Sequence, residues 1–390
     1  MIRERKDRNG LQVQVYAGRD PLSGRKRYVS RQVPGSGRTG MKQAKQVEAQ
    51  LLAEVAAGKH QGSGSITLAQ LLDEWIAWRE SNGKPISPAT LHNYRLTIDT
   101  KIKPGLGHLP VTKVDARVLD RFYTALRKGG NARTAGGALS ASRVRDVHAI
   151  LSGALGLAAR WNYVPFNAAV LARPPAPRNA ARKLPTPEQA KTLLAAAGQR
   201  DPEFELFARL GAATGLRRGE VVALRWRDLD LDGAELSVSG NVLFLRGLAG
   251  GFVRKDPKSE NSERLVALDA RTVKLLRAHR ARRAEDALAA GVALAEDSYL
   301  FTRVPDGARP IRPDSMTRRF NRLAARLGHD YTLHGLRHFM ATQLGAVAEA
   351  ATVRARMGHG SLAVSSIYTH RVSAADRAAA EHMGRILDEE

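Results

Sequence analysis

Five side chains in the second half of the sequence could together attack a phosphodiester. They are two arginines, two histidines and one tyrosine: Arg217, Arg337, His334, His359 and Tyr368. Phosphoryl transfer builds negative charge on two non-bridging oxygens, and planar guanidinium groups can bind both with directed hydrogen bonds. A phenol with a pKa of about 10 is a weak nucleophile, so Tyr368 needs neighbouring cations. The set predicts a covalent phosphotyrosine intermediate, with the histidines holding an oxygen or moving a proton.

Each of these residues also has a structural explanation when it is taken alone. His334 and Arg337 lie three residues apart, one turn of a helix that Thr332 could cap, and such pairs are usual on helix surfaces. His334 and His338 have the H-x-x-x-H spacing of a zinc site, but a zinc protease needs glutamate where this chain has Gly335. The joint occurrence of the five side chains therefore carries the prediction, and we expect no metal and no cofactor.

The charge balance indicates a polyanionic partner. The 390 residues include 62 Lys and Arg against 38 Asp and Glu, a formal net charge of +24. Nucleic acid is the polyanion that such a surplus favours, although a generally basic composition is the alternative. Cysteine is absent, which excludes disulfides, thiolate catalysis and cysteine-rich zinc sites. No run approaches about 18 apolar residues, so we expect a soluble cytoplasmic protein with no membrane partner.

The first predicted domain is a small basic module over residues 1–60. Leu11 to Tyr16 alternates apolar and polar residues, and Arg25 to Val33 reads as a further strand. We expect a three-stranded sheet with a helix behind it and a basic face in front, which could enter a major groove or simply be solvated. The helix is expected because apolar residues recur at helical spacing after Gly40: Met41, Ala44, Val47, Leu51, Leu52 and Val55. Gly35 to Gly40 matches G-x-G-x-x-G, but no second parallel strand follows to make a dinucleotide site.

Residues 61–175 are predicted to form a four-helix domain. Thr67 and Gln70 make a capping box, and Ser87-Pro88 begins a helix that should end before Pro104. Two more helices are expected over about 115–128 and 142–162. Their charged edges could lie along phosphates: Arg127, Lys128, Arg143 and Arg145.

The third predicted domain, residues 176–390, is mostly helical. A proline-rich basic linker over 171–184 precedes a helix capped by Thr186, and a β interlude spans about 234–268. Ser373 can cap a last helix whose apolar stripe would pack on the core of a monomer: Ala378, Ala379, Met383, Ile386 and Leu387. The expected fold class is therefore mainly α with small β elements.

The motifs resemble those of the tyrosine recombinases of the phage integrase family. Ala213 to Glu220 is similar to the family's first arginine box, His334 to Arg337 to its second, and Gly358-His359 is followed by Tyr368 at the family's spacing. The resemblance implies that Arg217 and Arg337 bind the phosphate, that Glu220 supports Arg217, and that Tyr368 is the nucleophile. His338, directly after Arg337, is expected to play a supporting role.

The resemblance also implies a catalytic lysine on a β-hairpin between the two arginine boxes. Pro257 to Leu268 fits that segment, so Lys258 is the choice and Lys255 is the rival. A positioned ammonium group could protonate the departing 5′ oxygen.

The implied activity is site-specific DNA recombination through a 3′-phosphotyrosine and a Holliday junction. An arm-binding sheet domain, a SAM-like core-binding domain and a catalytic domain would clamp double-stranded DNA at arm-type and core-type attachment sites. The resemblance further implies a homotetramer whose C-terminal tail packs on a neighbour, with a directionality factor and a host DNA-bending protein as partners in the bacterial nucleoid. A chromosome-dimer resolvase, a transposon recombinase, a type IB topoisomerase and a catalytically silent DNA-binding protein are the alternatives.

Overall fold

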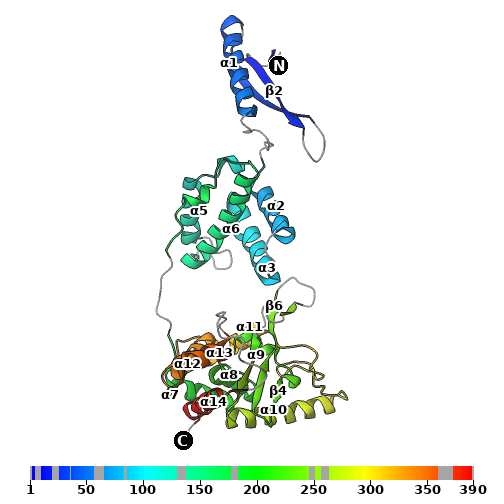
Figure 1. Cartoon of the computed structure of the whole chain (residues 1–390), viewed down its shortest axis with the longest axis vertical. Coiled ribbons are helices and arrows are strands. Elements are labelled where there is room, and N and C mark those ends of the chain that lie inside the picture. Colours follow the sequence, from blue (N-terminus) through cyan, green and yellow to red (C-terminus); the bar gives the residue numbers. More distant parts are fainter. Residues whose placement is uncertain are drawn as a thin grey trace. The chain divides into compact units, whose positions relative to one another are not determined.

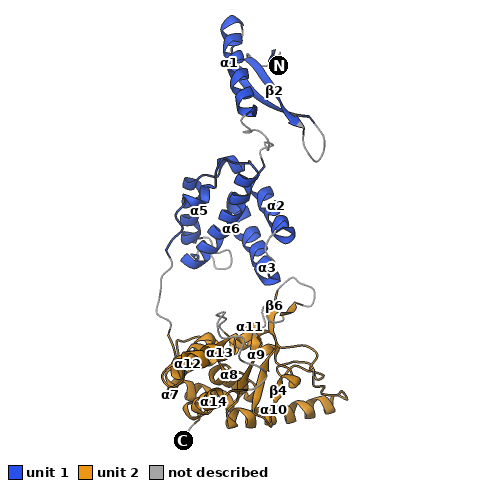
Figure 2. Cartoon of the chain, viewed as in Figure 1, with its two compact units in different colours: residues 1–179 blue, residues 180–390 orange. Residues whose placement is uncertain are grey.

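The chain folds into two compact units, residues 1–179 and 180–390 (Figures 1 and 2). The computed structural model describes residues 2–4, 10–19, 26–35, 37–56, 66–82, 86–129, 138–176, 183–245, 251–255, 263–358 and 372–388. Buried apolar residues of the first unit form two clusters, one within residues 11–51 and one within 68–172. Most of the described chain is helical and the sheets are small, which confirms the predicted fold class. The division into three domains stays a prediction.

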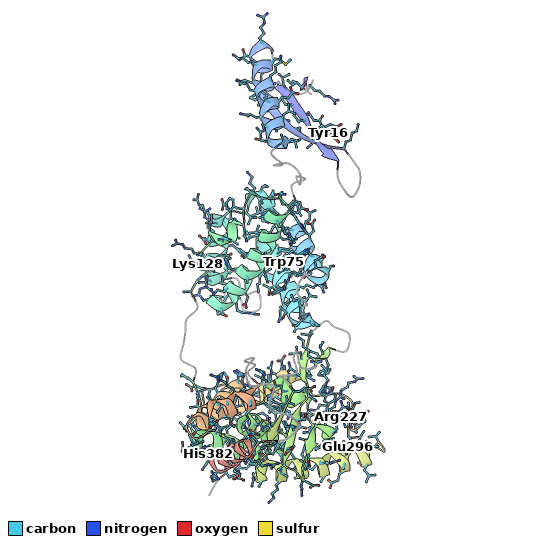
Figure 3. The ribbon with its side chains drawn as sticks, viewed as in Figure 1. Tyr16, Trp75, Lys128, Arg227, Glu296 and His382 are labelled. Carbon is cyan, nitrogen blue, oxygen red and sulfur yellow. The ribbon has the colours of Figure 1, made fainter. Side chains whose placement is uncertain are left out.

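The N-terminal module is a three-stranded antiparallel sheet with one helix packed against it. Strands β1 (Ile2–Glu4), β2 (Gly10–Arg19) and β3 (Lys26–Pro34) pair in that order, and α1 (Gly37–Ala56) follows. The alternation places Leu11, Val13 and Val15 beneath the helix. Tyr16 (Figure 3) and its cross-strand partner Tyr28 lie about half exposed. Their rings meet edge to face with centroids 5.7 Å apart.

The apolar stripe expected on α1 is narrower than predicted. Ala44 and Leu51 are buried, but Met41 and Leu52 are 42% and 53% exposed. At about 100° per residue, Met41 and Leu52 fall roughly 60–80° from Ala44 around the helix. The prediction that these two residues cover the sheet was therefore wrong.

The sheet face away from α1 is mainly polar among the described side chains. Most of the cations on which the expected basic face depends lie outside the described side chains, so that expectation stays a prediction. Arg31 pairs across from Val13, on the face toward the helix, and bonds Glu54 of α1 at 3.4 Å. The register places two exposed cations, Arg3 and Lys26, on the opposite face. Uncharged polar and aromatic residues make up most of that face: Gln12, Gln14, Tyr16, Tyr28, Ser30 and Gln32.

Residues 66–176 form a helical bundle. Its elements are α2 (Leu68–Ser81), α3 (Pro88–Thr97), η1 (Ile98–Ile102), α4 (Lys103–Leu106), η2 (Val111–Lys113), α5 (Ala116–Gly129), α6 (Ala141–Arg160) and η3 (Ala168–Val170). The Thr67–Gln70 capping box and the Ser87 cap are confirmed. Trp75, labelled in Figure 3, is buried together with the apolar residues on the same side of α2: Leu68, Leu71, Leu72 and Ile76. Lys128 and the three arginines of the predicted charged edges are exposed.

Helix α3 ends at Thr97, before Pro104 as predicted, but the chain continues past that proline in further helical turns, which was not predicted. The backbone passes through the π-helical turn η1, in which the Lys103 N–H bonds the Ile98 carbonyl five residues back. Pro104 then stands in the first turn of α4, where its missing N–H leaves no bond unmade. The change of helix type therefore lets the chain continue through a proline.

The second unit is built around the buried helix α8. Its helices are α7 (Pro187–Gly198), α8 (Pro202–Thr214), α9 (Arg218–Ala223), η4 (Trp226–Asp228), α10 (Ala270–Ala289), α11 (Pro313–Arg326), α12 (Leu333–Gly345), α13 (Ala350–Met357) and α14 (Ala374–Leu387). One antiparallel sheet has the order β4-β5-β8, formed by Leu229–Asp230, Glu235–Val238 and Arg264–Ala267. Strands β6 (Asn241–Phe244) and β7 (Phe252–Lys255) pair separately. The β interlude and the caps Thr186, Thr332 and Ser373 are confirmed.

The last helix, α14, packs on the core of its own unit. Ala379, Met383 and Leu387 are buried as predicted, whereas Ala378 is exposed and Ala380 takes its place in the stripe. The helix lies against α7, α8 and β8. Packing of this tail on a neighbouring chain stays an expectation.

Candidate active site

Arg217 stands at the turn between α8 and α9. Gly215 ends α8 with φ of +69°, a conformation that favours glycine, and a Cβ there would lie 2.0 Å from the Met340 Cε. Arg217 is the N-cap residue of α9, and Glu220 accepts both its backbone N–H at 2.9 Å and its Nη1 at 2.8 Å. The Arg217 side chain remains 45% exposed. The turn therefore exposes the Arg217 guanidinium to solvent, while the hydrogen bonds to Glu220 hold its orientation.

Arg337 lies on α12 and reaches the same turn from the interior. It is 2% exposed, and it donates from Nη1 to the Gly215 carbonyl and from Nη2 to the Met357 carbonyl. Burial, followed by the charge of Arg217, lowers the pKa of Arg337 to about 10. An anion bound beside Arg217 and Arg337 would relieve the repulsion between them. The two predicted phosphate-binding arginines are thus brought together from segments 120 residues apart in sequence.

The carboxylate of Glu220 joins a third arginine to this cluster. Arg264, at the start of β8, donates from Nη2 to the Glu220 Oε2 at 2.9 Å and from Nε to the Arg356 carbonyl at 2.9 Å. Burial acts to raise the pKa of Glu220, but Arg264 and Arg217 together hold it below its ordinary value. Glu220 is therefore ionised at neutral pH, and the guanidinium groups of Arg217 and Arg264 share its carboxylate.

His334 of the second box and His338, which follows it, lie on the first turns of α12. His334 is exposed and His338 is half-buried, and their rings meet edge to face with centroids 4.8 Å apart. Within the described part of the chain, no group of three or more His, Cys, Asp or Glu side chains could hold a metal ion. No helix among the described residues is long and apolar enough to cross a membrane.

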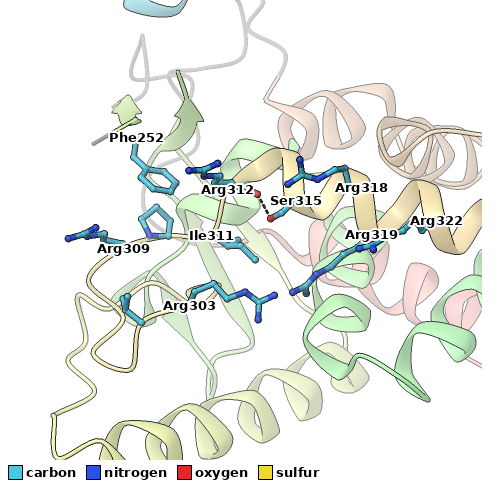
Figure 4. A pocket seen from close by; sticks show the side chains of 11 residues that line it. Phe252, Arg303, Arg309, Ile311, Arg312, Ser315, Arg318, Arg319 and Arg322 are labelled. Carbon is cyan, nitrogen blue, oxygen red and sulfur yellow. Dashed lines mark hydrogen bonds between the residues drawn. The ribbon is translucent and has the colours of Figure 1, made fainter. Parts of the chain in front are cut away.

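An arginine-lined pocket lies between β7, the segment 303–312 and α11 (Figure 4). Its volume is about 510 Å³, and Phe252, Pro310 and Ile311 provide apolar walls. Arg312 lies over the Phe244 ring at 4.1 Å, and Arg319 pairs with Glu203 at 3.0 Å. Six arginines line the pocket: Arg303, Arg309, Arg312, Arg318, Arg319 and Arg322. This surface can bind a polyanion through several guanidinium groups at once.

Helix α11 is tied to the turn that carries Arg217. Arg218 pairs with Asp314 at 3.0 Å and donates to the Thr317 hydroxyl at 2.7 Å. Helix α11, which lines the pocket, is therefore bonded directly to the turn that carries Arg217.

Comparison with known proteins decides the family. Residues 184–374 match the model of the phage integrase family, and residues 67–127 match that of the phage integrase N-terminal SAM-like domain. The ICEBs1 integrase of Bacillus subtilis (strain 168) is 26% identical over 373 residues, which cover 92% of each chain. The chain belongs to the phage integrase family of tyrosine recombinases. It is a site-specific tyrosine recombinase.

Further relatives extend over most of this recombinase. Tyrosine recombinase XerC of Xanthomonas campestris pv. campestris (strain B100) is 28% identical over 298 residues, 74% of this chain and 80% of the relative. The Tn1549 transposon integrase, solved in complex with a circular intermediate DNA, has a TM-score of 0.61 at 18% identity over 83% of this chain and all of that chain. A lambda integrase tetramer bound to a Holliday junction gives 0.57 at 17% identity, covering 95% of this chain and 97% of that one. These structures share the recombinase's fold.

Three predicted site residues, Lys258, His359 and Tyr368, lie outside the described residues. Lys255, the rival lysine, is described: it pairs with Asn241 across β6 and β7. A Cβ on Gly219 would lie 1.9 Å from the Asn241 Oδ1, so this hairpin packs closely on the turn after Arg217. The hairpin thus brings Lys255 toward the cluster, and the choice between the two lysines stays open.

Sequence reasoning missed Arg264 and Arg356. Arg356 is 2% exposed and donates to the Asp376 carboxylate at 2.6 Å and to the Ala267 carbonyl at 2.9 Å. In a chain with 62 Lys and Arg, neither arginine stands out. The local signal for Arg264 is its place at the head of a short apolar strand, and nothing local marks Arg356.

Proposed function

We propose that the recombinase is a phage or prophage integrase, which integrates and excises a mobile element at DNA attachment sites. Arg217 and Arg337 hold the two non-bridging oxygens of the scissile phosphate, and His334 and His359 bind an oxygen or accept the phenol proton. The Tyr368 oxygen forms a bond to phosphorus as the bond to the 5′ oxygen breaks. Lys258 gives a proton to that leaving oxygen.

The ester made by Tyr368 keeps the energy of the phosphodiester. A 5′ hydroxyl from another strand can therefore attack it and reverse the step without ATP. A first strand exchange of this kind produces a Holliday junction, and a second exchange resolves it. The observation that carries this proposal is the convergence of Arg217 and Arg337 on the Gly215 turn, with Glu220 ionised beside them.

The assembly proposed for this reaction is a homotetramer on double-stranded DNA in the bacterial cytoplasm. The arginine pocket and the exposed edge residues of α5 and α6 would follow core-site phosphates, and the N-terminal sheet would contact arm-type sites. A directionality factor and a host DNA-bending protein complete the proposed partners. The N-terminal module favours an integrase over a chromosome-dimer resolvase, since the simpler resolvases generally lack such a module. A transposon recombinase and a type IB topoisomerase remain the alternatives with the same active site.

A pool of nicked duplexes with randomised cores tests the proposal, because such a pool offers the protein every short core sequence at once. A nick just downstream of the cleavage point makes the released strand very short. This short strand, which carries the free 5′ hydroxyl, diffuses away, so the protein stays joined to the 3′ phosphate. We expect adducts that survive denaturation, carrying one enriched core sequence. A protein that binds the duplexes but yields no adduct would instead be a catalytically silent DNA-binding protein.

A further inference from the structure

Arg264 bridges two turns that are far apart in sequence. Its side chain is 8% exposed, and one end bonds Glu220 at the start of α9. The other end bonds the carbonyl of Arg356, in the last turn of α13. The planar guanidinium group thus fixes the distance between these two turns through two directed hydrogen bonds.

At its first end, Arg264 shares a carboxylate with Arg217. The Glu220 Oε1 accepts from the Arg217 side chain, while Oε2 accepts from the Arg217 backbone N–H and from Arg264. Arg264 therefore holds the plane of the carboxylate that sets the direction of the Arg217 guanidinium. Loss of Arg264 would leave the carboxylate free to turn and would remove one positive charge beside the phosphate site.

At its second end, Arg264 holds the turn that anchors Arg337. The carbonyl of Met357, the residue after Arg356, accepts from Arg337 Nη2. Gly358 follows with φ of +60°, and a Cβ there would lie 2.7 Å from the Arg264 Nη1. The guanidinium of Arg264 therefore lies directly against the backbone that leads to His359.

We propose that Arg264 is a positioning residue for strand cleavage, which aligns Arg217 through Glu220 and Arg337 through the Arg356–Met357 turn. This inference rests on the proposed function. Arg264 touches no reacting atom, so its contribution appears in the rate of the chemical step and leaves DNA affinity largely unchanged.

A purely structural role is the competing explanation, because a buried ion pair can also support folding. The two explanations predict different losses of cleavage rate when Arg264 and Glu220 are both replaced. If Arg264 acts through Glu220, removing both should cost little more than removing one, since residues that act as a unit are not additive. If Arg264 only supports the fold, the losses should follow thermal stability.

The experiment measures adduct formation on a nicked duplex carrying the selected core, at saturating and limiting DNA, together with the melting temperature. The variants are Arg264→Gln, Arg264→Lys, Glu220→Gln and the Gln/Gln double variant. Arg377→Gln is the control, because Arg377 of α14 forms an ion pair at 2.5 Å with Glu235 of β5, the strand that pairs with β8, and touches no member of the arginine cluster.

We expect Arg264→Gln to slow adduct formation at saturating DNA by about 10- to 100-fold, with half-saturation changed less than about threefold. In the Glu220→Gln background the same substitution should cost less than about threefold. Arg264→Lys should be intermediate, since it keeps the charge and loses the fork, and Arg377→Gln should keep the rate. If Arg264→Gln does not fold, Arg264→Lys is compared with wild type in its place.

Three results would each overturn the inference. They are wild-type rates in both Arg264 variants, multiplicative rate losses in the double variant, and rate losses that only parallel the loss of melting temperature. Wild-type protein that binds the duplex without forming an adduct would contradict the proposed function instead.

Discussion

The carboxylate of Asp376 accepts a hydrogen bond from the buried Arg356 Nη1 at 2.6 Å. Its second oxygen accepts the backbone N–H of Ala267, also at 2.6 Å. One side chain of α14 thus ties the last helix both to α13 and to the end of β8. Because Arg356 also donates to the Ala213 carbonyl at 3.2 Å, this pair connects α14 to the end of the helix that precedes Arg217.

Asp376→Ala should lower the free energy of unfolding of the second unit by about 3–5 kcal/mol, because it leaves the charge of Arg356 buried without its carboxylate partner. Urea denaturation measures the change. Glu381→Ala, at an exposed position of the same helix, is the control and should change stability by less than about 0.5 kcal/mol. Equal effects of the two substitutions would show that the ion pair does not hold α14.

Gly215→Ala should reduce both stability and cleavage. The residue has φ of +69°, which strains any residue with a Cβ, and the new methyl group would also meet the Met340 Cε at 2.0 Å, so the Met340 side chain must move. We expect a loss of at least about 1–2 kcal/mol, measured by thermal denaturation. Gly345→Ala, where a Cβ meets nothing within 4 Å, should be nearly neutral. A Gly215→Ala variant with wild-type stability and adduct yield would contradict the close packing of this turn.

Glu220→Gln should change stability in a pH-dependent way. The folded-state pKa of Glu220 is held below its ordinary value, so its stabilisation is present above the unfolded-state pKa of about 4.3 and is lost as pH falls through the folded-state pKa. We expect a destabilisation of about 1.5–3 kcal/mol at pH 7. The difference from wild type should shrink below about pH 4. A difference that stays constant from neutral to acid pH would contradict an ionised Glu220 in the cluster.

Arg318→Gln and Arg322→Gln should weaken duplex binding at low salt, because both residues line the arginine pocket. Each substitution should reduce the slope of log affinity against log salt concentration by about 1 if the residue contacts a phosphate. Arg282→Gln on α10, which contributes no residue to the pocket, is the control. Unchanged slopes in the pocket variants would place the DNA on another surface. Fluorescence anisotropy over a salt series makes the comparison.

Local features of the fold could be predicted from sequence. Thr67, Thr186 and Ser373 each cap the helix that their spacing predicts, because a capping hydrogen bond spans only three residues. The alternation in β2 likewise predicts its buried face. The π-helical turn before Pro104 could not be predicted, since local propensity favours a helix end at that proline.

Only those site residues that belong to a recognisable catalytic motif could be predicted from the sequence. Arg217, Arg337 and Glu220 come together as the motifs indicate. The carboxylate partner of Arg264 is Glu220, 44 residues away in sequence, and that of Arg356 is Asp376, 20 residues away. Such pairs depend on how β8, α9, α13 and α14 pack. Periodicity and spacing contain no information about that packing.

The identity of the nucleophile is the most direct test of the proposed chemistry. Protein trapped on the nicked duplex is digested with protease and nuclease, and the modified peptide is sequenced by mass spectrometry. We predict a nucleotide joined through its 3′ phosphate to Tyr368, and no adduct from Tyr368→Phe protein that still binds the duplex. A nucleotide on another residue, or an adduct formed by Tyr368→Phe, would contradict the account.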